Sequence, residues 1–273
     1  MNTLSVRGVR IGEGLPKICV SLTEKSKDAI LKQAEVILQS PVDIVEWRVD
    51  CFDSACYDSA CYDSACCNSV CFEEIIAILN PLRERLKDVP LIFTFRSLEE
   101  GGQKSLDSLK YTQLLKKVMK SKTVDIIDVE VFKSGLGDDT LLGELLSFAK
   151  NHKVLVLASY HDFTTTPPEE ELIARLEHMR SLDVGLLKIA VMPENEQDVQ
   201  TLLSVGEKYN ARARHLPLVA ISMGELGKRS RLINQNFTPS FTFGSLGKGS
   251  APGQIHVDEL HKLLRQPHHT FLR

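Results

Sequence analysis

Several protein classes are excluded by what this chain of 273 residues does not contain. No apolar run approaches the roughly 18 residues that a membrane-spanning helix needs. The opening MNTLSVRGVRIGEG also lacks a hydrophobic signal core. These two absences predict a cytoplasmic protein with no membrane partner.

An excess of basic charge is also missing. The 33 Lys and Arg residues stand against 36 Asp and Glu, which gives a formal net charge of −3. Proteins that bind the phosphate backbone carry a surplus of Lys and Arg, so no nucleic-acid partner is expected. No glycine-rich loop follows the first apolar run, residues 18–22, and this argues against dinucleotide binding by an open, doubly wound sheet.

Cysteine is scarce outside one segment, residues 51–71, because only Cys19 lies elsewhere. This segment reads CFDSACYDSACYDSACCNSVC, three tandem copies of Phe/Tyr-Asp-Ser-Ala-Cys and a degenerate fourth. With no secretory signal the thiols are expected to stay reduced, which disfavours a disulfide framework. The uniform spacing matches no common zinc pattern. We interpret the segment as a repeat expansion in a tolerant loop, with metal binding and a redox-sensitive loop as the alternatives.

Along the rest of the chain, short apolar runs alternate with amphipathic helical patterns. The expected strands are residues 18–22, 43–49, 90–96, 123–130, 154–161, 184–192, 217–223 and 241–245. The expected helices are residues 24–39, 73–87, 105–121, 138–151, 168–181, 195–209, 225–235 and 256–265. Thr166, followed by two prolines and three glutamates, predicts a capped helix start.

This alternation predicts a (β/α)8 barrel, an α/β fold whose parallel strands are apolar on both faces. Residues 1–273 are expected to form one catalytic domain, with a short N-terminal β-hairpin over residues 4–15. The insertion at 51–71 then follows the second strand, in a loop on the catalytic face of the barrel. A doubly wound open sheet is the main alternative.

Lys188 is the most informative residue, because it lies within an apolar strand. Strand alternation places Leu186, Lys188 and Ala190 on one face, so one apolar face must hold a lysine. The lysine could extend to solvent from a strand end or pair with a buried carboxylate. Alternatively, desolvation lowers its pKa and leaves a free amine that attacks a ketone.

His161, which ends the neighbouring strand, is a candidate proton shuttle for that amine. A histidine at a strand end is more often structural when it stands alone. Adjacent strands, however, bring His161 beside Lys188, and an imine-forming lysine next to a base suited to neutral pH is a coherent pair.

Charged residues at other strand ends converge on the same face. Glu46 and Arg48 share one side of their strand, and either direct ligand contact or an internal ion-pair network fits them equally. For Arg96 and Glu100 we favour a functional role, in which the carboxylate orients His161 and the guanidinium holds an anionic substrate.

The last two strands are followed by further candidates. Met223 and Arg231 lie in ISMGELGKRSRL, and Ser250 and Gln254 lie in SAPGQ, where they could bind hydroxyl and carboxylate groups. Ordinary turn chemistry also explains SAPGQ, and core packing also explains the methionine.

In order, these motifs resemble the type I 3-dehydroquinase family. They are EWRVD (46–50), FTFRSLEEGG (93–102), SYHDF (159–163), LLKIAVMP (186–193), ISMG (221–224), SRL (230–232), FTFG (241–244) and SAPGQ (250–254). The resemblance spans nearly the whole chain. It implies dehydration of 3-dehydroquinate to 3-dehydroshikimate in the shikimate pathway, without metal or organic cofactor, by a homodimer.

The resemblance also assigns roles. Lys188 would form an imine with the substrate ketone, His161 would act as general base and acid, and Glu100 would orient this histidine. The implied substrate-binding residues are Glu46, Arg48, Arg96, Arg231, Ser250 and Gln254, with Met223 and Phe243 as apolar walls. The rival activities are a class I aldolase, which shares the strand lysine, and a catalytically inactive barrel that serves as a scaffold.

Overall fold

Parallel strands form the centre of the protein, as the apolar runs predict. The computed structural model describes residues 3–53, 72–136, 139–212, 215–233, 237–247 and 249–266. The strands are β3 (Lys17–Leu22), β4 (Ile44–Arg48), β5 (Leu91–Thr94), β6 (Ile126–Glu130), β7 (Leu155–Asp162), β8 (Leu186–Val191), β9 (Leu218–Ser222), β10 (Phe241–Ser245) and β11 (Ile255–His256). Their order in the sheet is β11-β10-β3-β4-β5-β6-β7-β8-β9, and every pairing in it is parallel.

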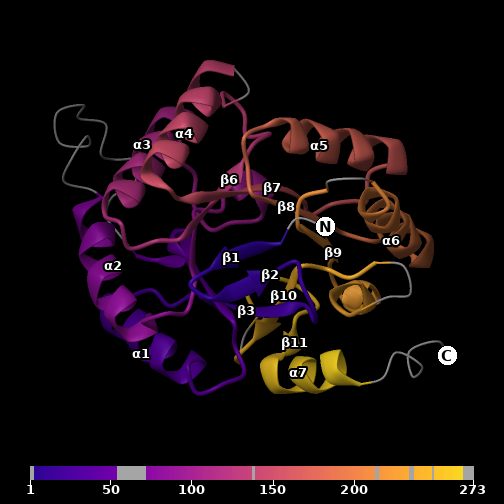
Figure 1. Ribbon diagram of the computed structural model, residues 1–273, viewed down its shortest axis with the longest axis horizontal. Helices are drawn as coiled ribbons and strands as arrows, with labels where there is room; N and C mark the ends of the chain where they lie inside the picture. Colours follow the sequence, from indigo (N-terminus) through magenta and orange to yellow (C-terminus); the bar gives the residue numbers. More distant parts are fainter. Residues whose placement is uncertain are drawn as a thin grey trace.

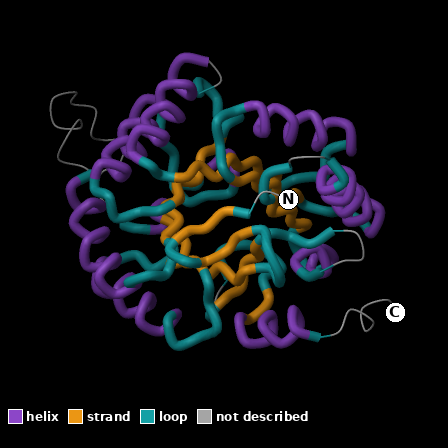
Figure 2. The backbone as a smooth tube through the Cα atoms, viewed as in Figure 1, coloured by secondary structure: helices purple, strands orange, loops and turns teal. Residues whose placement is uncertain are grey.

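Helices surround this sheet on the outside (Figure 1), and Figure 2 shows the strands gathered at the centre. The α-helices are α1 (Lys27–Ile37), α2 (Glu73–Leu86), α3 (Ser108–Lys120), α4 (Asp139–His152), α5 (Glu169–Ser181), α6 (Glu196–Asn210) and α7 (Val257–Arg265). Among the described helices, none is both long and apolar enough to cross a membrane.

The sheet curls until β9 lies beside β10. At this seam the Ser240 amide donates to the carbonyl of Leu218 at 2.9 Å. Eight strands, β3 to β10, therefore enclose an interior, and the predicted (β/α)8 barrel is confirmed.

The expected N-terminal hairpin is also present, as β1 (Leu4–Val6) paired antiparallel with β2 (Val9–Ile11). It lies over the middle of the strands in Figure 1, and Val6 and Ile11 pack into the apolar cluster of the barrel interior. The hairpin thus closes the end of the barrel where the strands begin.

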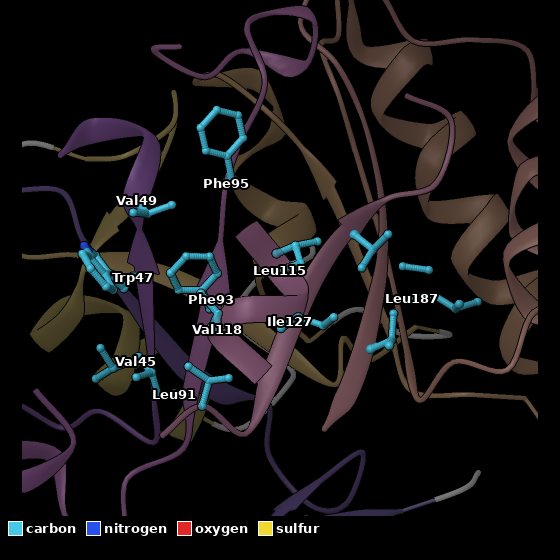
Figure 3. Packing of buried hydrophobic residues seen from close by; sticks show 14 of the residues in the cluster. Val45, Trp47, Val49, Leu91, Phe93, Phe95, Leu115, Val118, Ile127 and Leu187 are labelled. Carbon is cyan, nitrogen blue, oxygen red and sulfur yellow. The ribbon is translucent and has the colours of Figure 1, made fainter. Parts of the chain in front are cut away.

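Alternation along each strand divides the core into two parts. Side chains such as Trp47 and Phe93 point outward into the layer between sheet and helices (Figure 3), and their rings meet edge to face at 5.6 Å. Inward-pointing residues such as Cys19 and Ile44 form the smaller interior cluster. Lys188 shares its face with Leu186 and Ala190 of that interior cluster.

Two local predictions were wrong. An α-helix is expected over residues 225–235, but residues 225–233, the part of this range that the structure describes, contain only the short 3-10 helix η4 (Leu226–Arg231). The Ser230 hydroxyl binds the backbone of Ser222 at the end of β9, and a Cβ on Gly227 would lie 2.0 Å from the Ser222 carbonyl. Contacts with β9 therefore hold this segment in a tighter winding than helical periodicity suggests.

The second error concerns the start of α5. Thr166 does not cap this helix, because its N-cap residue is Pro168 and no side chain caps it. The Thr166 hydroxyl instead donates to the Met192 carbonyl at 3.0 Å and ties the loop before α5 to the end of β8.

The predicted insertion follows β4 through the short 3-10 helix η1 (Val49–Cys51), and α2 begins after it. Residues 54–71 lie outside the described residues, so the structure does not test the interpretation of the repeat. Of the cysteines in the insertion only Cys51 is described, and burial, with the charge of Asp50, raises the pKa of its thiol to about 11.

Candidate active site

Polar side chains fill the barrel interior only near the carboxyl ends of the strands. A lower layer is apolar and consists of Cys19, Ile44, Ile92, Ile126, Leu157 and Leu186. Two residues further along these six strands, on the same side, the side chains become polar, and they are Ser21, Glu46, Thr94, Asp128, Ser159 and Lys188. On β9 and β10 the interior side stays apolar, with Ile221 and Phe243. The buried charges are thus placed at the face where barrel enzymes hold their catalytic groups.

A cavity opens at this face. It is lined by all of the predicted catalytic and substrate-binding residues, namely Glu46, Arg48, Arg96, Glu100, His161, Lys188, Met223, Arg231, Phe243, Ser250 and Gln254. Phe163, Ala190, Ile221 and Ala251 complete the lining. Residues spread over more than 200 positions of sequence therefore meet in one place.

The Lys188 side chain lies at the bottom of this cavity and is only 6% exposed. Its Nζ is 3.7 Å from Asp128 Oδ2, 3.9 Å from Glu46 Oε1 and 4.4 Å from the centre of the Phe243 ring. Both carboxylate distances exceed that of a hydrogen bond. Burial lowers the pKa of Lys188, and although Glu46 and Asp128 oppose this, the net shift is downward.

His161 is buried and bonded to a carboxylate. Its Nδ1 lies 2.8 Å from Glu100 Oε2. Burial, together with the nearby charges of Arg96 and Lys188, lowers the pKa of His161 well below its ordinary value. The imidazole is therefore neutral near pH 7, with Nε2 left for a second interaction.

Arg96 connects the carboxylates on this side of the cavity. Its Nη2 donates to Asp128 at 2.7 Å, and its Nη1 lies 2.9 Å from Glu130 and 3.1 Å from Glu100. Burial alone would lower the pKa of Arg96, but these carboxylates raise it, so the guanidinium stays charged. The three carboxylates therefore compensate the positive charge of Arg96 within the protein.

Arg48 and Glu46, from β4, are also anchored. Arg48 binds Asp50 through two parallel hydrogen bonds of 2.8 and 2.7 Å. Glu46 accepts hydrogen bonds from the Ser21 hydroxyl at 2.6 Å and the Thr94 hydroxyl at 2.9 Å. These contacts fix the orientation of both side chains at the cavity wall.

Arg231 has a different environment. It is buried, its Nη2 donates to the Pro252 carbonyl at 2.9 Å, and its Nε has no hydrogen-bond partner within the described part of the chain. Burial lowers the pKa of Arg231 to about 10. A buried cation without an acidic neighbour attracts an anionic ligand.

The loop that carries Ser250 and Gln254 closes over the cavity beside Arg231. The Gln254 side chain bonds both the amide and the hydroxyl of Ser250 at 2.9 Å, and that hydroxyl donates to Ser21 Oγ at 3.0 Å. Both side chains are thereby oriented toward the barrel interior, where they line the cavity.

Two buried carboxylates of the site, Asp128 and Glu130, were missed by the sequence analysis. Both are fully buried near the end of β6 and bind Arg96. A signal was present, because strand alternation in TVDIIDVE puts both acids on one face. Within the described ranges, no three His, Cys, Asp or Glu side chains are arranged to hold a metal ion.

The fold and this cavity define a class of protein: a (β/α)8-barrel enzyme with a buried lysine beside a histidine–carboxylate pair at the carboxyl ends of its strands. The model of the type I 3-dehydroquinase family matches residues 18–270. The chain belongs to this family, whose members are hydro-lyases.

Individual relatives match this chain over nearly its full length. A 3-dehydroquinate dehydratase of Clostridioides difficile is 39% identical over 265 residues, 97% of each chain. One from Bacillus subtilis is 37% identical over 264 residues, 97% of this chain and 96% of the relative. A crystal structure of the type I enzyme from Clostridium difficile with covalently modified comenic acid matches with a TM-score of 0.84 at 38% identity, over 96% of each chain.

Proposed function

We propose that this chain removes water from 3-dehydroquinate to give 3-dehydroshikimate, and that the reaction runs through an imine on Lys188. The observation that carries this proposal is the state of that amine. It is buried in a cavity, its pKa is lowered, and no carboxylate of the described residues lies within hydrogen-bond distance of it. A lowered pKa increases the fraction of the amine that has a free lone pair with which to attack a ketone carbon.

The first step joins the substrate to the protein. Lys188 Nζ bonds to the ketone carbon, the carbonyl oxygen departs as water, and a protonated imine remains. Its positive charge withdraws electrons, so a proton on the adjacent carbon becomes acidic. The neighbouring carboxylates Glu46 and Asp128 face the nitrogen that carries this charge.

His161 then moves the protons. In the tautomer whose Nδ1 proton bonds Glu100, 2.8 Å away, the lone pair of Nε2 is free to take the acidic proton of the substrate. The same imidazole returns a proton to the hydroxyl group that leaves as water. Hydrolysis of the resulting conjugated imine frees the product and restores the Lys188 amine.

The remaining cavity residues hold the substrate. Arg231 binds its carboxylate, with Ser250 and Gln254 closing over it. Glu46, Arg48 and Arg96 meet its hydroxyl groups and the surrounding polar network, and Met223 and Phe243 form apolar walls. This division follows from charge: only Arg231 among these arginines lacks a carboxylate partner in the described residues.

Borohydride trapping tests the covalent step. Reductant added during turnover is expected to fix substrate on Lys188, which peptide mass spectrometry locates, and Lys188→Ala is expected to abolish trapping. Lys133→Ala is the matched control, because Lys133 is equally buried but pairs with Glu99 away from the cavity. Label on another lysine, or on none, would refute the proposed mechanism.

The role of His161 needs a second variant. His161→Ala is expected to stop turnover while some imine still forms, since the amine does not depend on the imidazole for its nucleophilicity. If trapping and turnover are lost in equal measure in this variant, the division of roles between the two residues is wrong.

One assay separates this activity from its rivals. Dehydration of 3-dehydroquinate produces an enone whose ultraviolet absorbance rises with time. A class I aldolase would cleave a carbon–carbon bond without this signal, and an inactive scaffold would give no change.

A homodimer and a cytoplasmic location belong to the same proposal. The homodimer rests on the family resemblance alone, and the location rests on the absence of a long apolar run. Light scattering of the purified chain tests the dimer, which a monomeric mass at micromolar concentration would exclude, and cell fractionation tests the location.

A further inference from the structure

Lys188 lies near two buried carboxylates, those of Glu46 and Asp128, which have different hydrogen-bond partners. Glu46 is held by two hydroxyl groups, those of Ser21 and Thr94. Asp128 is held by the guanidinium of Arg96 at 2.7 Å and by the hydroxyl of Ser159 at 2.7 Å. Arg96, which follows β5, therefore binds one carboxylate oxygen of Asp128, and Ser159, on β7, binds the other.

Asp128 is the member next to Lys188 in a chain of polar groups. From Lys188 the chain runs over 3.7 Å to Asp128, then to Arg96, on to Glu100 at 3.1 Å, and to His161 at 2.8 Å. It joins the nucleophile to the base that acts beside it. Asp128 is fully buried, so solvent does not screen its charge.

We infer that Asp128 is a positioning residue for the reaction: held by Arg96 and Ser159, it fixes the Lys188 nitrogen and stabilises the positive charge that this nitrogen carries once the imine has formed. The inference rests on the proposed function, since it presumes an imine on Lys188. It assigns to Asp128 an action on the lysine itself, beyond its contact with Arg96.

Other charged or titratable groups also lie near Lys188. They are Glu46 and Arg48 on β4, Arg96 after β5, Glu100 in the short 3-10 helix η3 (Leu98–Glu100), and His161 on β7, with the Cys19 thiol on β3. The two arginines and burial lower the pKa of Lys188, and Glu46 and Asp128 raise it. Because Asp128 raises the pKa of Lys188, its loss is expected to lower that pKa.

Glu130 supplies a matched control within the same network. It is as fully buried as Asp128, comes from the same strand and binds the same guanidinium at 2.9 Å. Unlike Asp128, however, it forms no ion pair with Lys188 in the described residues. Asp128→Asn and Glu130→Gln each remove one buried charge from Arg96, but only the first removes a charge beside Lys188.

The readout must be independent of turnover. The rate at which methyl acetimidate modifies Lys188, followed by peptide mass spectrometry between about pH 6 and pH 10, reports the pKa of the amine. Asp128→Asn is expected to shift this profile to lower pH by about one unit, and Glu130→Gln is expected to leave it in place. Asp128→Asn should also lower kcat about 10-fold or more with little change in KM, because the charged imine forms only after binding.

Equal profiles in the two variants, or an unshifted profile in Asp128→Asn, would overturn the inference. Circular dichroism checks that each variant folds. If Asp128→Asn does not fold, Asp128→Glu moves the charge by one methylene group, and the profile must then shift relative to the unmodified protein. Failure of borohydride trapping in the unmodified protein would instead refute the imine itself, so the two failures are distinguishable.

Discussion

The three arginines of the cavity show how one residue type serves different purposes. Arg48 binds Asp50 and Arg96 binds three carboxylates, so the charges of both are compensated inside the protein. Arg231 has only the Pro252 carbonyl as a described partner, although it is just as buried. A buried cation in this state is stabilised when an anion arrives, which makes Arg231 the strongest candidate for the substrate carboxylate.

Arg231→Gln is therefore expected to reduce kcat/KM by roughly 30-fold to 1000-fold, since loss of one partner of a buried charge pair costs about 2–4 kcal/mol. The effect should fall mainly on KM. Steady-state kinetics of dehydration measures both parameters. Arg229→Gln is the control, because Arg229 lies two residues away and pairs with Glu196 at the surface. A similar loss of kcat/KM in both variants would argue against carboxylate binding by Arg231.

At the scale of elements, the turn after η3 decides where Glu100 lies. The Gly102 amide donates to the Ser97 carbonyl at 2.7 Å, and a Cβ on Gly102 would lie 1.8 Å from the Arg96 carbonyl. Gly101 has a φ of +83°, a region that favours glycine. The two glycines allow the chain to turn back sharply enough for Glu100 to reach His161.

Gly102→Ala is expected to lower the free energy of unfolding by about 2 kcal/mol and to reduce kcat, because the displaced turn moves Glu100 away from the imidazole. Urea unfolding and steady-state kinetics measure the two effects. Gly143→Ala is the matched control: Gly143 lies inside α4, and apart from its chain neighbours and the backbone of its own helix, no atom of the described residues lies within 4 Å of an added Cβ. This control should be stabilised by about 0.5–1 kcal/mol without loss of kcat.

At the scale of the whole molecule, stability and catalysis are assigned to opposite ends of the barrel. At the amino end, just before β6, Asp125 accepts hydrogen bonds from Arg7 at 2.6 Å, from Arg83 at 2.8 Å and from the Leu91 amide at 2.9 Å. These contacts tie the N-terminal hairpin and α2 to the sheet. None of these residues lines the catalytic cavity.

Asp125→Ala is expected to lower the free energy of unfolding by about 2–3 kcal/mol, because it removes the one carboxylate that two partly buried arginines and a backbone amide share. kcat should change by less than about twofold, since the substitution lies at the far end of the barrel. Asp183→Ala, which removes an exposed pair with Lys150, should cost less than about 0.5 kcal/mol. A large fall in kcat for Asp125→Ala in fully folded protein would contradict this separation.

The sequence by itself determined the eight barrel strands, most of the helices and eleven of the residues that line the cavity, but not the buried carboxylates Asp128 and Glu130. Periodicity is a local property, so it shows that Lys188 and Leu186 share a face and that charged residues follow the strand ends, and barrel topology then brings those ends together. The prediction of a helix at 225–235 was wrong because tertiary contacts, which a local pattern does not show, shape this segment. Its contacts with Ser222 belong to the folded structure and not to the pattern of the segment.

Only the tertiary structure decided which charges are compensated. Whether Arg96 meets Asp128 and Glu130, and whether Arg231 meets no carboxylate among the described residues, depends on distances between strands that no local pattern encodes. The same holds for the pKa of Lys188, because desolvation and the positions of Glu46 and Asp128 exist only in the folded chain. The physical reason is that a residue's type is set by the sequence, whereas its burial and its neighbours are set by packing.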